Sequence, residues 1–353
     1  KGEYYIIFSS GSPAALCSGV GALLGCWLAG ITNFRLLGGV SAGAFIALLS
    51  SMGLNAIQIL HFILDVDFSD KLSPRNDLLR LSKWLGRSRK ADGNSDDDDR
   101  VPREWRSTGL LSTYGIESSI DACATAHNIN PLKWPKSFWT MATTKEGSPV
   151  LFKEDGVFLI ENDRKIRRLS DETIAPSQAV RMSCTIPLVM AALRYKGTFL
   201  FDGALSRDGV CPVGIQIRHF GTDPRKIIAC FLGDDSNDLL AGRVHSLCRG
   251  AWGVDPQRHW GQETAGVISF RPQIDHLHPL SFDLTRDDKW LAILISFESC
   301  VWRLAFEGIL IGESIEKSQN LMRDLAVWRS PRSPGEPRLS DRAQRCFTEY
   351  GLY

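Results

Sequence analysis

The chain has 353 residues, of which 44% are hydrophobic and 23% charged, and its formal net charge is +1. This composition is typical of a globular protein with one large domain or two ordinary ones. A net charge so close to zero argues against a general nucleic-acid-binding protein, which carries an excess of basic residues. We therefore expect no nucleic-acid partner.

The nine cysteines are scattered along the chain, their number is odd, and no two have Cys-x-x-Cys spacing. This pattern favours buried free thiols in a reducing compartment over a disulfide framework. No cluster has the spacing of zinc ligands, and no Cys or carboxylate pattern completes a site around His276 and His278. We expect a cytoplasmic protein that uses neither a metal nor another cofactor.

The first predicted elements form a β-α-β unit. Residues 4–8 are a short apolar run typical of a buried parallel strand. Residues 14–31 are mostly apolar and long enough for a membrane span, and Gly21 and Gly25 even give the small-xxx-small spacing of membrane helices. However, a second strand at 35–39 follows closely, and no basic flank orients a span. The order favours a helix buried in an α/β core.

The second strand leads into Gly39-Val40-Ser41-Ala42-Gly43, which has the Gly-x-Ser-x-Gly spacing of a nucleophile elbow. Glycines on both sides leave room for a sharp turn with strained backbone angles. The turn places Ser41 at the N-terminus of a helix predicted over 42–52, where free backbone N–H groups can stabilise an oxyanion. The alternative is a tight strand-to-helix turn with only a structural role.

Further elements follow the elbow, and a polar, charged stretch at 75–99 separates the first of them from the rest. We expect a flexible insertion near 86–103. The predicted elements are a helix at 56–64, strands at 139–143 and 149–152, a helix at 177–183, strands at 198–201 and 226–232, and a helical stretch from 289 to about 328.

The helical stretch near the C-terminus contains an apolar stripe. Trp302, Phe306 and Ile309 fall at three- and four-residue spacing, which predicts a helix face turned toward the core.

A nucleophilic serine needs a base, and none of the seven histidines lies in a sequence context that indicates this role. A carboxylate can serve directly when its pocket raises its proton affinity. Asp202 fits this role because it ends the strand at 198–201, and Gly203 after it lets a substrate approach closely. The alternative is that Asp202 is only a structural cap or turn residue.

Together the two motifs resemble those of the patatin-like phospholipase family, in which a Gly-x-Ser-x-Gly elbow and an Asp-Gly-Gly/Ala motif supply a Ser–Asp dyad. The matching residues are Gly39-Val40-Ser41-Ala42-Gly43-Ala44 and Asp202-Gly203-Ala204. The segments at 139–144, 179–187 and 208–213 also resemble family segments, so the resemblance covers roughly residues 4 to 235.

The resemblance implies a three-layer α/β/α fold with a mostly parallel central sheet. We expect this catalytic domain at 1–240 and a mostly helical accessory or cap region, without a family match, at 241–353. The implied activity is hydrolysis of fatty-acyl esters of phospholipids or other lipids. Ser41 would be the nucleophile of an acyl-enzyme mechanism and Asp202 the base, without a metal.

The implied partners are an acyl-lipid substrate, a membrane surface in transient contact and a regulator bound through the C-terminal region. The protein would be peripheral at membranes. Candidates for an apolar mouth, each with the core as its alternative, are Trp84, Trp105, Trp134, Trp139 and residues 57–68. The basic stretch at 163–168 would meet anionic head groups or form a solvated hairpin.

The chain departs from the family at its first, glycine-rich motif, which matches residues 9–14. Only Gly11 remains of the glycines, and Pro13 has no N–H to donate. The oxyanion donors would be N–H groups near Gly11, Ser12 and Ala42. Two alternatives stay open, namely a catalytically weak or inactive module that binds lipid or protein, and a Ser–His–Asp esterase.

Overall fold

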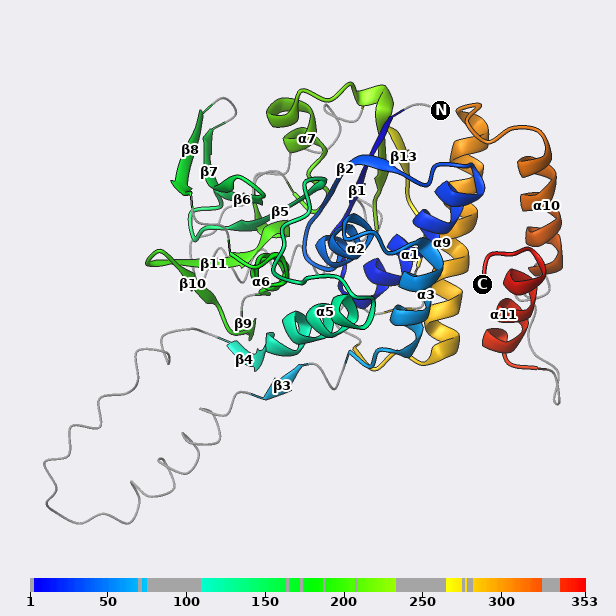
Figure 1. Cartoon of the computed structure of the whole chain (residues 1–353), viewed down its shortest axis with the longest axis horizontal. Coiled ribbons are helices and arrows are strands. Elements are labelled where there is room, and N and C mark those ends of the chain that lie inside the picture. Colours follow the sequence, from blue (N-terminus) through cyan, green and yellow to red (C-terminus); the bar gives the residue numbers. More distant parts are fainter. Residues whose placement is uncertain are drawn as a thin grey trace, which may run out of the picture.

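A computed structural model describes residues 3–68, 72–74, 109–162, 165–171, 174–186, 188–206, 209–232, 265–274, 277, 282–325 and 337–353 (Figure 1). The flexible insertion predicted near 86–103 lies outside these ranges. So do Trp84, Trp105 and the histidines at 245, 259, 276 and 278.

The molecule is organised around one mixed β-sheet with the main strand order β13-β12-β1-β2-β5-β6-β7-β8. Its parallel part is β13 (Ile268–Phe270), β12 (Ile227–Cys230), β1 (Tyr4–Phe8), β2 (Phe34–Gly39) and β5 (Phe138–Thr143). An antiparallel meander follows, with β6 (Pro149–Lys153), β7 (Gly156–Asn162) and β8 (Lys165–Ser170). The predicted parallel centre is thus confirmed.

Two smaller strand groups lie beside this sheet. β11 (Thr198–Asp202) pairs with the end of β5 and with β10 (Leu193–Tyr195), both antiparallel. A separate sheet consists of β3 (Ser73–Pro74), β4 (Gly109–Ser112) and β9 (Leu188–Met190). Pairing of β4 with β9 brings the segments on either side of β5 to β8 together.

Helices cover both faces of the sheet. Successive side chains of a strand point to opposite faces, so the apolar residues of a central strand are buried on both sides only when helices cover each face. Ile6 and Phe8 of β1 join the large core that contains α1, whereas Ile7 packs in another core with Val213. The large core contains α1 (Ser12–Leu28), α2 (Ala42–Ser51), α3 (Ala56–Asp65), α6 (Pro176–Ser183) and α9 (Arg286–Phe306), and α7 (Val213–Phe220) covers the opposite face.

Helix α1 is the apolar stretch that also had the length of a membrane span, and it lies buried against α9. A Cβ on Gly21 would overlap the carbonyl oxygen of Ile293, and one on Gly25 would lie 2.8 Å from Cys300 Sγ. The small-residue spacing therefore serves close packing of two helices within the protein. Among the described helices, none combines the length and the hydrophobicity that a membrane span requires.

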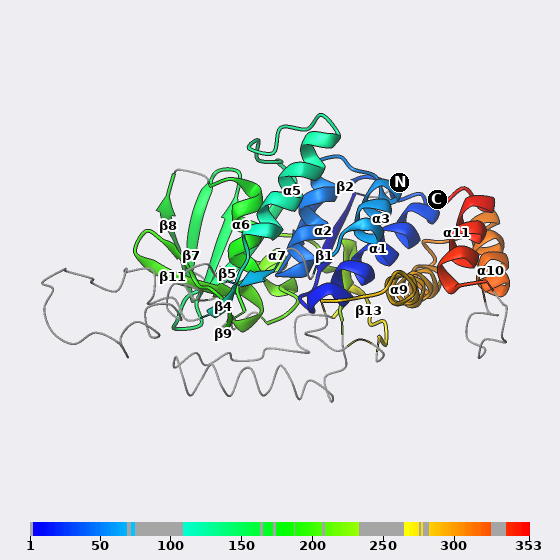
Figure 2. The same cartoon turned by 90° about the horizontal axis from the view of Figure 1, so that it is seen from below.

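The predicted helical stretch from 289 to about 328 divides into two helices within its described part. α9 ends at Phe306, α10 (Glu313–Leu325) follows, and Gly308 and Gly312 between them have φ of 68° and 60°. A last helix, α11 (Leu339–Glu349), packs near α10. In both views α10 and α11 lie at the opposite end of the molecule from β7 and β8 (Figures 1 and 2).

The prediction of a core-facing stripe on α9 is wrong, because Trp302 is 61% exposed and Phe306 82% exposed. A second apolar series with the same spacing, which includes Trp290, Phe297 and Leu304, is fully buried instead. The rings of Trp290 and Phe297 pack against Phe347 of α11, whereas the glycines of α1 lie against Ile293, Ser296 and Cys300 of α9. β13 and α9 belong to the same sheet and the same large core as the N-terminal part. The domain boundary near 240 stays a prediction.

Candidate active site

Ser41 lies on the turn between β2 and α2 with φ of 55° and ψ of −127°, which is a strained conformation for a non-glycine residue. A Cβ on Gly39 would overlap the backbone of Gly43, and one on Gly43 would overlap the carbonyl of Phe8. Both positions require glycine, because the turn packs closely on its own backbone at Gly39 and on the end of β1 at Gly43.

Ser183, at the end of α6, supports this turn from the other side. Its hydroxyl accepts the N–H of Ser41 at 2.8 Å and donates to the carbonyl of Met141 in β5 at 2.6 Å. The sequence analysis assigned Ser183 no role, although it lies in the segment at 179–187 that resembles the family. Its position in that segment was the one feature of the sequence that could have indicated a role near the active site.

Asp202 ends β11 beside β5, opposite Ala142. Its N–H donates to the carbonyl of Thr185 at 2.7 Å, and its Oδ1 accepts the N–H of Ala204 at 2.9 Å. A Cβ on Gly203 would overlap the carbonyl of Met141, so the glycine after the aspartate is required by close packing on β5. Asp202 therefore also serves as the local cap that its alternative interpretation predicted.

The structure brings Ser41 and Asp202 together, and each residue is only 4% exposed. Burial raises the pKa of Asp202 to about 6, although hydrogen bonds from the Ser41 hydroxyl and the Ala204 N–H lower it. A carboxylate with a pKa near neutrality is a stronger base than an exposed one and is still ionised at pH 7. The pair has the composition and polarity of a nucleophile with its base.

Cys184 is a third group at this position, and the sequence analysis gave it no role either. Burial, together with the nearby charge of Asp202, raises the pKa of the Cys184 thiol well above its ordinary value, and the neighbouring Ser41 side chain lowers it. Because the thiolate is the reactive form of cysteine, the thiol at this site stays a weak nucleophile at neutral pH.

An apolar cavity opens beside Ser41. Ser41 is among its lining residues and Asp202 is not, so a ligand in the cavity meets the hydroxyl rather than the carboxyl. The apolar lining comes from several elements and includes Leu16, Phe45, Phe68, Ile116, Met190 and Phe282. Of the stretch at 57–68, Phe68 thus reaches the site, whereas Trp134 and Trp139 belong to the core and not to a mouth.

Two helices begin at this cavity, since Pro13 in the first turn of α1 and Ala42 at the start of α2 both line it. The N–H of Ser10 donates to the carbonyl of Val210 at 2.7 Å and is therefore engaged elsewhere. Gly11 has φ of 152°, and a Cβ there would overlap the side chain of Leu232. The predicted oxyanion role of the Gly11, Ser12 and Ala42 N–H groups remains a prediction.

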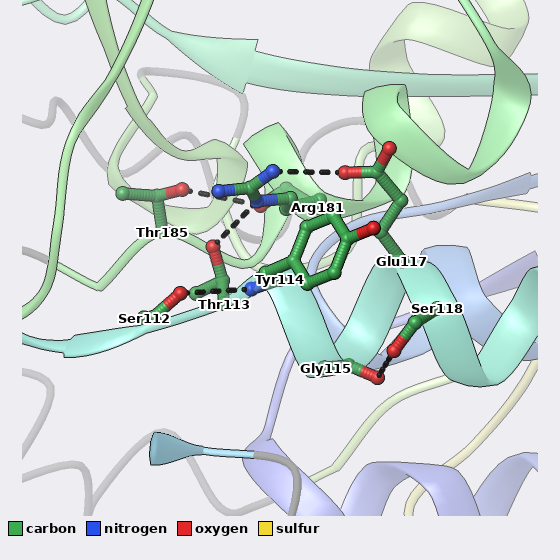
Figure 3. A network of polar contacts seen from close by, with 8 residues as sticks. All are labelled: Ser112, Thr113, Tyr114, Gly115, Glu117, Ser118, Arg181 and Thr185. Atoms are coloured by element: carbon green, nitrogen blue, oxygen red, sulfur yellow. Dashed lines mark hydrogen bonds and ion pairs between the residues drawn. The ribbon is translucent and has the colours of Figure 1, made fainter. Parts of the chain in front are cut away.

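A polar network beside the cavity joins α6 to α5 (Tyr114–Ala126), as Figure 3 shows. Arg181 Nε donates to Thr113 Oγ1 at 3.0 Å, and its Nη1 donates to Glu117 Oε2 at 2.9 Å. The guanidinium also lies 5.6 Å from the ring centroid of Tyr114. Because Ile116 of α5 lines the cavity, this network fixes one cavity wall to the helix that supports the nucleophile.

The described histidines, His61, His127 and His219, are not among the lining residues of this cavity. The His61 ring packs on Tyr353 with 4.4 Å between centroids, and His127 Nδ1 lies 2.9 Å from the carbonyl oxygen of Cys123. Within the described ranges, no group of three His, Cys, Asp or Glu side chains could hold a metal ion.

The basic stretch at 163–168 is described only in part, on the hairpin of β7 and β8. Lys165 and Arg167 both form ion pairs with Glu161, at 2.9 and 2.8 Å. Arg168 pairs with Asp171, so each of the three described cations has an acidic partner nearby in the sequence, which favours the solvated hairpin.

Comparison with known proteins gives a family and several similar solved structures. The family model described as patatin-like phospholipase matches residues 6–213. No curated protein matches the sequence. Three similar solved structures are each 12% identical to the chain. VipD from Legionella pneumophila has a TM-score of 0.47 and covers 99% of this chain and 79% of its own.

The other two are more distant in structure. ExoU from Pseudomonas aeruginosa has a TM-score of 0.39, with 98% of this chain and 69% of its own covered. Human GIVD cytosolic phospholipase A2, in complex with methyl gamma-linolenyl fluorophosphonate, has a TM-score of 0.41, with 90% and 59% covered.

Proposed function

The chain belongs to the patatin-like phospholipase family, and from this premise we propose that it hydrolyses lipid acyl esters with Ser41 as nucleophile and Asp202 as base. One observation carries the proposal. The hydroxyl of Ser41 lines an apolar cavity and lies beside the buried carboxyl of Asp202, whose pKa is raised to about 6.

The first half of the reaction forms an acyl-enzyme. Asp202 accepts the proton of the Ser41 hydroxyl while Ser41 Oγ attacks the ester carbonyl carbon. Negative charge develops on the carbonyl oxygen, and the N–H groups of Gly11, Ser12 and Ala42 are the proposed donors to it. The alcohol portion of the lipid then leaves with the proton held by Asp202.

The second half releases the fatty acid. Asp202, ionised again, accepts a proton from water, and the resulting nucleophile attacks the acyl carbonyl. Collapse of the second tetrahedral intermediate returns the proton to Ser41 and frees the fatty acid. The two residues suffice for both proton transfers, so no imidazole is required.

The proposed substrate is an acyl lipid, with phospholipids as the class and phospholipase A as the activity. The apolar residues of the cavity suit a fatty-acyl chain, because each buried methylene contributes about 0.8 kcal/mol. The substrate would enter from a membrane surface that the protein contacts transiently, at the periphery of membranes in the cytoplasm. A regulator acting through the C-terminal region stays a prediction.

The test is release of fatty acid from phosphatidylcholine vesicles by the wild type and by Ser41→Ala. We expect release with the wild type and none above background with the variant. A fluorophosphonate probe, which reacts with activated serines, should label the wild type and not Ser41→Ala. Equal release by both proteins would refute the proposed nucleophile.

The departure at residues 9–14 supports a second candidate, a family member that binds lipid or a protein partner with little turnover. Pro13 has no N–H, and the N–H of Ser10 is engaged by Val210, so fewer donors remain for an oxyanion. Loss of one such donor costs about 3 kcal/mol, or roughly a thousandfold in rate. Binding of vesicles without release of fatty acid or labelling by the probe would favour this candidate.

The third candidate, a Ser–His–Asp esterase, is distinguished from the Ser–Asp hydrolase and from the binding protein by replacing each of the seven histidines with alanine. The Ser–Asp mechanism predicts that every such variant that folds keeps its activity. Loss of activity at one histidine, with the fold intact, would identify a triad instead.

A further inference from the structure

We propose that the C-terminal region forms one wall of the acyl-chain cavity, and that Lys289 of α9 is the residue that positions this wall. The inference rests on the proposed function, because it takes the apolar cavity beside Ser41 as the site of the acyl chain. It gives the region after residue 213, which the family match does not cover, a defined part in substrate selection.

The C-terminal region contributes one residue directly to this wall. Phe282 lines the cavity and comes shortly before α9. Helix α9 begins with a capping box, in which Thr285 Oγ1 accepts the N–H of Asp288 at 3.1 Å and Asp288 Oδ2 accepts the N–H of Thr285 at 3.0 Å. The start of α9, and with it the chain that leads to Phe282, is therefore fixed by its own sequence.

The rest of the wall depends on Lys289, one turn further along α9. Lys289 is only 5% exposed, and its Nζ donates to the carbonyls of Leu64 at 3.1 Å and Val66 at 2.6 Å. These carbonyls are at the C-terminal end of α3, where backbone carbonyls lack partners within the helix. A positive charge there also interacts favourably with the helix dipole. The ammonium group thus caps α3 and fixes the chain that leaves it.

That chain reaches the cavity two residues later, at Phe68. Lys289 Nζ lies 5.7 Å from the ring centroid of Phe68, a cation–π distance. The Phe68 ring packs edge-on against Phe45 with 6.4 Å between centroids, and both rings line the cavity. Because Lys289 contacts both the backbone before Phe68 and the ring itself, it determines where this part of the wall lies.

A buried lysine is costly, which indicates that the position is not a simple packing site. Burial lowers the pKa of Lys289, while the charges of Asp67 and Asp65 act in the opposite sense and Arg286 adds to the lowering. A second tie between the same elements, from Arg286 to Asp65 at 3.0 Å, is exposed and contributes little. The buried contacts of Lys289 are therefore the main polar link between α9 and the end of α3.

The test compares Lys289→Met with Phe68→Ala, which alters the same wall without removing the buried charge. Lys317→Met, on α10, is the matched control, since α10 contributes no residue to the cavity lining. In a Ser41→Ala background, parinaric acid fluorescence reports fatty-acid binding without turnover. In the active protein, kcat and KM are measured for p-nitrophenyl butyrate and p-nitrophenyl palmitate, and thermal unfolding confirms that each variant is folded.

We expect Lys289→Met and Phe68→Ala to weaken parinaric acid binding about tenfold and to raise KM for the palmitate ester by a similar factor. The butyrate ester, whose acyl chain is shorter and contacts less of the wall, should be affected less than the palmitate ester in both variants, so the ratio of the palmitate KM to the butyrate KM should rise. Lys317→Met should match the wild type throughout. A role limited to stability would lower the unfolding temperature and leave the ratio of the two KM values unchanged.

The inference is overturned if folded Lys289→Met keeps the wild-type ratio of KM values and the wild-type binding of parinaric acid. It is also overturned if Phe68→Ala leaves both unchanged, because the wall then plays no part in acyl binding. Absence of hydrolysis by the wild type, combined with parinaric acid binding that Lys289→Met weakens, would refute the proposed function and support this inference.

Discussion

The backbone N–H of Ser41 donates to the hydroxyl of Ser183 at 2.8 Å, although the two residues are 142 positions apart in the chain. The same Ser183 hydroxyl donates a hydrogen bond to the carbonyl of Met141. A non-glycine residue with φ of 55° carries strain of about 1–3 kcal/mol and keeps this conformation only when surrounding contacts impose it. Ser183 supplies such a contact, and it links the elbow to β5.

Replacing Ser183 with alanine should therefore affect both stability and turnover. The variant leaves the Ser41 N–H and the Met141 carbonyl unpaired in a buried place, which costs about 2 kcal/mol. A less constrained elbow should also lower kcat about tenfold or more, since about 1.4 kcal/mol of transition-state stabilisation corresponds to a factor of ten. Urea denaturation and ester hydrolysis measure the two effects.

Ser177→Ala is the matched control for this variant. Ser177 is on the same helix and fully buried, and within the described ranges its hydroxyl has no hydrogen-bond partner. Its removal takes away an unpaired buried hydroxyl, so it should not destabilise the fold and should leave kcat unchanged. Equal kcat values for Ser183→Ala and Ser177→Ala would contradict the supporting role of Ser183.

The raised pKa of Asp202 predicts the pH dependence of the reaction. Asp202 must be ionised to accept the proton of Ser41, and with a pKa of about 6 it loses that capacity as the pH falls through this value. We expect kcat/KM to rise with pH to a plateau above about pH 7, with an apparent pKa near 6. A flat profile from about pH 5 to pH 8, or a midpoint that moves in a His→Ala variant, would count against Asp202 as the base.

The same pKa has a consequence for stability, with the opposite dependence on pH. The folded state holds the Asp202 proton up to about pH 6, whereas the unfolded chain loses it near the ordinary value of 3.8. Between these values the folded state binds more protons, so its stability falls as the pH rises. Above pH 6 the ionised, buried carboxylate destabilises the fold by about 3 kcal/mol, at roughly 1.4 kcal/mol per pKa unit.

Asp202→Asn removes this penalty, because the amide stays neutral while its oxygen can still accept the Ala204 N–H. The variant should lose turnover and should be more stable than the wild type by up to about 3 kcal/mol near pH 8. The difference should vanish below about pH 3, where the carboxyl is protonated in both states. Denaturation at several pH values measures it, and a variant that is less stable than the wild type at pH 8 would contradict the assigned environment of Asp202.

The network around Arg181 predicts a measurable coupling between α5 and α6. The side chains of Arg181 and Glu117 are each 19% exposed, so their ion pair is stronger than an exposed pair. A double-mutant cycle with Arg181→Met and Glu117→Gln should give a coupling energy of about 1–2 kcal/mol. Arg181→Lys should not restore stability, because an ammonium lacks the planar fork that reaches Thr113 and Glu117 together. A coupling below about 0.3 kcal/mol would contradict the network.

The parts of the fold that follow from local sequence were predictable. The strand at 4–8, the elbow at Ser41 and the antiparallel strands at 139–143 and 149–152 are all present, because their apolar runs and turns specify them independently of distant residues. Glycine was informative for the same reason, since Gly39, Gly43 and Gly203 each stand where a Cβ would overlap backbone atoms.

The contacts between distant segments were not predictable from the sequence. Trp302 and Phe306 of α9 have the spacing of a core face, yet the buried faces of α9 are those that pack on the glycines of α1 and on Phe347 of α11. A lysine in an amphipathic helix is ordinarily expected on the surface. Lys289 is buried because its Nζ donates to backbone carbonyls at the end of α3, a segment far away in the sequence. Ser183 and Cys184 reach Ser41 only through the packing of α6 on α2 and β5, which no local pattern encodes.

The most direct test of the central claim is to trap the acyl-enzyme. The protein is mixed with p-nitrophenyl palmitate, quenched in acid during turnover and digested, and the acylated peptide is identified by mass spectrometry. We predict a palmitoyl group on Ser41 in the wild type and none in Ser41→Ala. Acylation of Cys184 in its place, or steady hydrolysis by Ser41→Ala, would contradict the account.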